Sequence, residues 1–138
     1  MPAARPTPDD HDLVVLRVPA DPRYARVVRV AVSAFAVRLG LVPAAVEDLR
    51  LAVDEALILL MGSSEGEGAD GHGPTIVVTL DADGDRPPVS VEMHLDPAPK
   101  AGEPDASARS RFEEIIPADV SIEALDQLRG RIALRHPA

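Results

Sequence analysis

The chain has 138 residues, the usual length of one domain, and 46% of them are hydrophobic, so a buried core is expected. It contains no cysteine, which excludes a disulfide scaffold, a thiol nucleophile and any cysteine-ligated metal site. Its net charge of −9 argues against direct binding to nucleic acid, because an acidic surface repels phosphate groups.

The first eleven residues are rich in proline, and we expect a disordered tail at 1–11 followed by a single domain at 12–138. The tail lacks the apolar segment of a signal peptide. No run approaches the roughly 18 apolar residues that span a bilayer. These features favour a cytoplasmic protein that does not bind membranes.

The first half of the chain predicts one strand and two helices. Leu13–Val18 is an apolar run rich in valine, which is typical of a strand. Asp21 and the proline after it form a typical helix start, and apolar residues at helical spacing predict a helix that ends at Gly40. A second helix is expected over about Pro43–Met61, again from the spacing of its apolar residues.

The second half predicts mainly strands and loops. Two connections rich in glycine, proline and small polar residues are expected to be loops: 62–74 and 97–108. The other predicted elements are, in order, a strand, a hairpin connection, a second strand, a short helix and a last strand: 75–80, 81–88, 89–95, 121–128 and 131–135. Apolar and polar residues alternate in the second of these strands, as in a sheet with one wet face.

This order of elements predicts an α+β fold. Reading along the chain gives strand, helix, helix, strand, strand, loop, helix, strand. Two consecutive helices beside an antiparallel hairpin favour a two-layer sandwich, in which a mixed, mainly antiparallel sheet carries its helices on one face.

Motifs that usually indicate a nucleotide-binding or metal site do not support such a site in this sequence. Gly66–Gly71 spells G-x-G-x-x-G, but a nucleotide loop of that kind follows a strand and opens a helix, whereas here a helix precedes and a strand follows. The four histidines have no metal-ligand spacing, and we expect all of them at the surface: His11, His72, His94 and His136. The sequence therefore predicts no metal site.

The second predicted helix carries a family resemblance. Val46–Gly62 (VEDLRLAVDEALILLMG) resembles the N-box helix of the GHKL (histidine-kinase-like) ATPase superfamily, in particular the anti-sigma-factor, serine/threonine switch-kinase branch. That branch carries a pattern like D-L-x-L-A-V-x-E-A-x-x-N-A, and the residues that match it are Asp48, Leu49, Leu51, Ala52, Val53, Glu55 and Ala56. The order of elements over 13–96 is also similar. The resemblance implies that Glu55 orients or deprotonates the attacking hydroxyl or water, and that Asp96 contacts adenine.

Relative to this family's pattern, the nucleotide-binding motifs of the sequence are degenerate. Leu59 stands where the family has an asparagine that helps hold Mg²⁺, and leucine offers no oxygen ligand. The family's D-x-G-x-G box is replaced by Asp96-Pro97-Ala98-Pro99-Lys100, which keeps the aspartate and loses both glycines. We therefore expect no cofactor, and ATP with Mg²⁺ only if the pocket is functional.

The resemblance implies an anti-sigma-factor-like regulator that binds a protein partner, either a sigma factor or an anti-anti-sigma protein, without ATP-dependent catalysis. The alternative is an active ATP- and Mg²⁺-dependent serine/threonine kinase that phosphorylates an anti-anti-sigma partner. Arg23, Arg26 and Arg29 could form a basic stripe on the first helix that attracts the partner, or simply a solvated helix face. A homodimer would fit the family, whose members pair through the sheet edge and first helix.

Overall fold

The computed structural model describes five stretches of the chain: 12–63, 73–82, 88–98, 106–126 and 130–137. The expected tail at 1–11, the Gly66–Gly71 motif and most of both expected loops lie outside the described residues. Within the described stretches, no helix combines the length and the apolar character that crossing a membrane requires.

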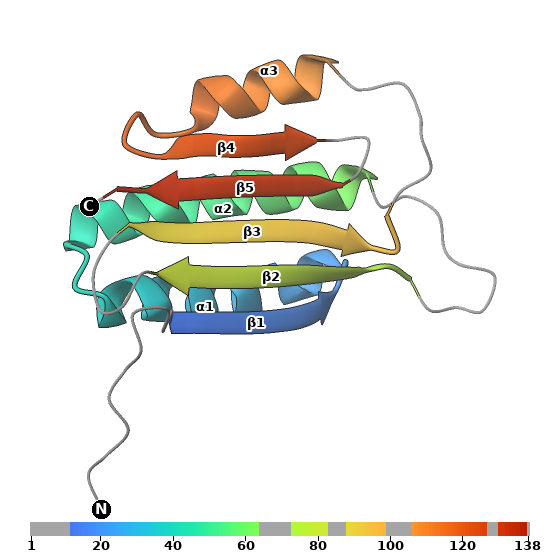
Figure 1. The fold of residues 1–138 in the computed structure, drawn as a ribbon. Helices are drawn as coiled ribbons and strands as arrows, with labels where there is room; N and C mark the ends of the chain where they lie inside the picture. Colours follow the sequence, from blue (N-terminus) through green and yellow to red (C-terminus); the bar gives the residue numbers. More distant parts are fainter. Residues whose placement is uncertain (1–11, 64–72, 83–87, 99–105, 127–129, 138) are drawn as a thin grey trace, which may run out of the picture.

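The described strands form one five-stranded sheet in the order β1-β2-β3-β5-β4. Their bounds are β1 Asp12–Pro19, β2 Thr75–Ala82, β3 Val89–Asp96, β4 Ser121–Asp126 and β5 Arg131–His136. All four neighbouring pairs are antiparallel. Figure 1 shows α1 and α2 behind the sheet and no helix in front of it. The predicted α+β class and two-layer arrangement are confirmed.

The two predicted N-terminal helices are present as α1 (Ala25–Arg38) and α2 (Pro43–Ser63). A 3₁₀ turn at Pro22–Tyr24 precedes α1, and the Asp21 side chain caps it by accepting a hydrogen bond of 2.9 Å from the Arg23 N–H. The Arg23 side chain and then its backbone N–H donate to Asp21 and lower the pKa of that carboxyl. This cap therefore persists at neutral pH and is lost as the pH falls through the lowered pKa.

The core lies between the inward face of the sheet and the two long helices. Cross-strand register places Val78, Met93 and Ile132 side by side on β2, β3 and β5, and all three are fully buried. Leu49 and Val53 of α2 are fully buried in the same cluster. The apolar residues of β3 therefore point toward the helices, and its polar residues point to the other face of the sheet, which is called the open face below.

A third helix, α3 (Ala106–Ile115), begins inside the segment expected to be a loop at 97–108, so that expectation is wrong for its last residues. The helix is polar along most of its length, which hid it from a search for apolar periodicity. Arg109 and Glu113 form an ion pair of 3.3 Å one turn apart along it. Phe112 is buried in the shared core, and α3 packs against α2. The burial of Phe112 thus stabilises α3, whose own sequence favours a helix only weakly.

The helix expected at 121–128 is also wrong, because Ser121–Asp126 forms strand β4. Ile122 and Leu125 are three residues apart, a spacing that suggests a helix face. A bulge between Ile122 and Ala124 adds one residue to the strand, so Ile122 and Leu125 both pack against the core. The observed order is therefore strand, two helices, two strands, helix, two strands.

Candidate functional site

Glu55 and Leu59 lie one turn apart on α2, on a side that is partly exposed. The opposite side of the helix, which includes Val53 and Leu57, is buried in the core. No hydrogen bond or ion pair joins the Glu55 carboxylate to another described side chain. Because residues at i and i+4 share a helix face, Leu59 lies beside Glu55 where an oxygen ligand would be needed to hold Mg²⁺.

Asp96, the residue expected to contact adenine, lies at the end of β3 on the open face of the sheet. Its neighbour Leu95 is buried on the side of the helices, and side chains alternate along a strand. The Asp96 Oδ2 accepts a hydrogen bond of 2.8 Å from Arg17 Nη1, and its carbonyl accepts one of 3.2 Å from Thr75 Oγ1. The structure therefore places the Asp96 carboxylate on the opposite side of the sheet from Glu55.

The three arginines expected to form a basic stripe have different surroundings. Arg23 forms an ion pair of 2.8 Å with Asp21. The Arg29 Nε lies 3.3 Å from Asp54 Oδ1 on α2, so its charge is directed toward the neighbouring helix. Arg26 is exposed on α1. The positive charge available to a partner from this set is therefore concentrated on Arg26.

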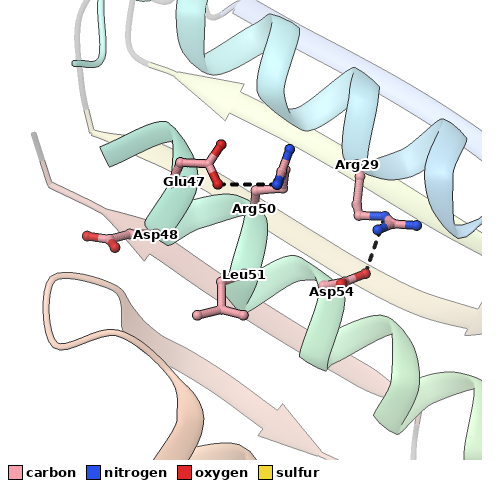
Figure 2. Close-up of a pocket in the computed structure, with 6 residues that line it drawn as sticks. All are labelled: Arg29, Glu47, Asp48, Arg50, Leu51 and Asp54. Carbon is pink, nitrogen blue, oxygen red and sulfur yellow. Dashed lines mark ion pairs between the residues drawn. The ribbon is translucent and has the colours of Figure 1, made fainter. Parts of the chain in front are cut away.

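A small pocket of about 260 Å³ lies on α2 where Arg29 reaches over from α1 (Figure 2). The residues that line it are Arg29, Glu47, Asp48, Arg50, Leu51 and Asp54. Glu47 pairs with Arg50 at 3.2 Å, and Arg29 pairs with Asp54, so both basic side chains already have acidic partners. The pocket is smaller than most ligand sites and carries more acids than bases, which makes it a poor site for nucleotide phosphates.

One histidine departs from the expectation that all four lie at the surface. His136 is only 3% exposed, because β5 pairs it with the fully buried Val89 on the core face. The alternation of Ile132, Leu134 and His136 along β5 could have indicated this burial from the sequence. His94 is half-buried on the open face, and His11 and His72 lie outside the described residues.

Comparisons with known proteins find partial similarity to a kinase. No protein-family model matches the chain. It is 42% identical over 45 residues to the serine-protein kinase RsbW of Bacillus pumilus (strain SAFR-032), and 43% identical over 47 residues to RsbW of Listeria monocytogenes (serotype 4b, strain F2365). RsbW of Listeria innocua matches over the same length with the same identity.

About a third of this chain is similar to a serine-protein kinase. The matched segments amount to 33% and 34% of this chain. They span 28% and 30% of the length of the curated relatives. This similarity supports the resemblance to the anti-sigma, serine-kinase branch over that part of the chain.

Proposed function

We propose that this protein is a regulator of the anti-sigma, serine-kinase type that binds a protein partner and does not transfer phosphate. The partner is a sigma factor or an anti-anti-sigma protein, as the resemblance implies. Two findings support the proposal: the partial similarity to RsbW and the two-layer architecture, in which the long helix α2 packs one side against the sheet.

The proposal that the protein binds a partner without transferring phosphate rests mainly on one observation. Glu55 and Asp96, which the resemblance places at a nucleotide, lie on opposite sides of the sheet. Phosphoryl transfer depends on positioning and on metal ions that neutralise the phosphates. Leu59 supplies no metal ligand beside Glu55. Asp96 is held by Arg17 on the other side of the sheet. A nucleotide bound near Glu55 would therefore lack both its metal clamp and its adenine contact.

Calorimetric titration of the purified protein with ATP and Mg²⁺ tests this proposal. We expect no saturable binding at millimolar nucleotide, and no gain in the Leu59→Asn variant, because restoring one ligand does not turn Asp96 toward α2. A serine-protein kinase RsbW titrated under the same conditions serves as the positive control. Saturable binding by the unaltered chain would contradict the proposal and favour the alternative, a kinase in which Glu55 acts as the base.

The exposed Arg26 predicts how the partner is attracted. Arg26→Glu should slow association with an acidic sigma-factor or anti-anti-sigma partner by roughly 3–10-fold at low ionic strength, and less at high salt. Arg109→Glu is the matched control and should have a smaller effect, because it reverses one exposed charge on α3, away from α1. Stopped-flow association rates at two salt concentrations measure this. Equal rates for Arg26→Glu and the unaltered protein would exclude this face as the attracting surface.

We also propose that the regulator forms a homodimer through the β1 edge and α1. Among the described strands β1 pairs only with β2, so its outer edge leaves backbone groups unpaired. Apolar side chains surround this edge: Leu13 and Val15 are each 60% exposed on β1, and Val27 and Val30 are 46% and 59% exposed on α1. A second copy related by a two-fold axis would present the same strand and helix and cover this surface.

A further inference from the structure

A cluster of three possible metal ligands lies away from Glu55 and Asp96. Asp48, Asp119 and His136 each offer one ligand atom, and these atoms all lie within 4.8 Å of one another. They come from three separate parts of the fold: α2, the connection between α3 and β4, and the end of β5. Folding therefore brings together one imidazole nitrogen and two carboxylate oxygens that are far apart in the chain.

Each of these side chains is held by an ordered backbone. Asp48 precedes the fully buried Leu49 in the second turn of α2. Asp119 lies in a turn in which the N–H of the buried Val120 donates a hydrogen bond of 3.0 Å to the Pro117 carbonyl. His136 is buried on the core face of β5. The cluster runs from this buried imidazole to the exposed Asp119, so an ion could enter from solvent.

The charges of the cluster favour a divalent cation. Two carboxylates at this separation repel each other unless a positive charge lies between them. A protonated imidazole would supply one positive charge, whereas a divalent metal ion balances both carboxylates and also uses the imidazole nitrogen as a ligand. A mixed set of nitrogen and oxygen ligands suits zinc and related transition metals better than magnesium or calcium.

The spacing also fits one ion. Zinc binds imidazole nitrogen and carboxylate oxygen at about 2.0–2.2 Å, so ligand atoms around a tetrahedral zinc lie roughly 3.4 Å apart. Small side-chain rotations would bring atoms within 4.8 Å of one another to that separation. Three protein ligands would leave the fourth position for water.

We infer that Asp48, Asp119 and His136 form a binding site for a divalent transition metal of the zinc type. The ion would join the end of β5 and the α3–β4 connection to α2, so its main effect would be on the stability of the fold. This site does not depend on the proposed regulatory function, and it uses neither Glu55 nor Asp96.

Zinc titration of the full chain, first freed of metal with a chelator, tests the site. We expect one zinc ion per chain by calorimetry, and at least a tenfold weaker affinity in Asp119→Asn, whose exposed position should leave folding intact. Glu114→Gln is the control, because it removes one exposed acidic charge outside the cluster and should bind zinc normally. The absence of zinc binding by the unaltered chain, or an equal affinity in Asp119→Asn, would overturn the proposal.

Thermal unfolding gives a second readout. Zinc at about 100 times its dissociation constant should raise the melting temperature by roughly 5–10 °C, because a ligand that binds only the folded state stabilises it. The rise should reverse on adding chelator and should be at most about half as large in Asp48→Asn and Asp119→Asn, because a tenfold weaker affinity leaves zinc at only about 10 times the dissociation constant. An equal rise in these variants would mean that zinc binds elsewhere, and the site would be rejected.

Discussion

Replacing Phe112 with alanine is expected to lower the free energy of unfolding by about 3–5 kcal/mol, a large part of the roughly 5–15 kcal/mol of a typical domain. Phe112 is only 3% exposed and anchors α3, which is otherwise polar, in the core shared with α2. Its loss would leave a cavity under a helix that has few other apolar contacts. Urea denaturation followed by circular dichroism measures the change.

Ile115→Ala is the matched control for this experiment. Ile115 lies on the same helix but is 40% exposed, so its truncation should cost less than about 1 kcal/mol. A loss below 1 kcal/mol for Phe112→Ala would show that α3 is not docked through this side chain. Equal losses for both variants would show that the burial of Phe112 does not set the cost, and helix propensity could not explain the losses because alanine favours a helix more than either residue.

Charges placed on the exposed face of α1 are expected to convert the proposed dimer into monomers. In the double variant Val27→Lys and Val30→Lys, two apolar side chains that would be buried between copies become two like charges. We expect the dimer dissociation constant to rise on the order of 100-fold or more, since each buried valine contributes roughly 1.5 kcal/mol or more. Sedimentation equilibrium at several protein concentrations measures this constant.

The control for the dimer is Ile58→Lys, which adds a charge at an apolar residue that is at least as exposed as the two valines but lies on α2. It should leave the dissociation constant unchanged, because α2 is not part of the proposed interface. A monomeric unaltered protein at high micromolar concentration would contradict the homodimer and leave the β1 edge and α1 free for a different partner.

Local sequence signals were sufficient to predict the limits of α1 and the two faces of β3. Asp21 caps the 3₁₀ turn that leads into α1, and Gly40, whose φ of 81° favours glycine, follows the end of that helix. Alternation along β3 gave its two faces, because a strand's side chains alternate whatever lies around it. These elements were predicted because their causes lie within a few residues.

The candidate site was predictable only in part. That Leu59 lies beside Glu55 follows from helix geometry alone and could be read from the sequence. The side of the sheet on which Asp96 lies follows from the alternation along β3. Its ion pair with Arg17 could not be read from the sequence, because Arg17 belongs to β1, which lies far away in the chain.

The sequence by itself determined the α+β class, the two long helices, and the position of Leu59 beside Glu55. The tertiary structure alone decided that α3 is held by Phe112, that a bulge makes β4 a strand, and that Asp48, Asp119 and His136 meet. The physical reason is the range of the interactions. Caps, turns and periodicity act over a few residues, whereas burial and strand register join segments that no local pattern connects.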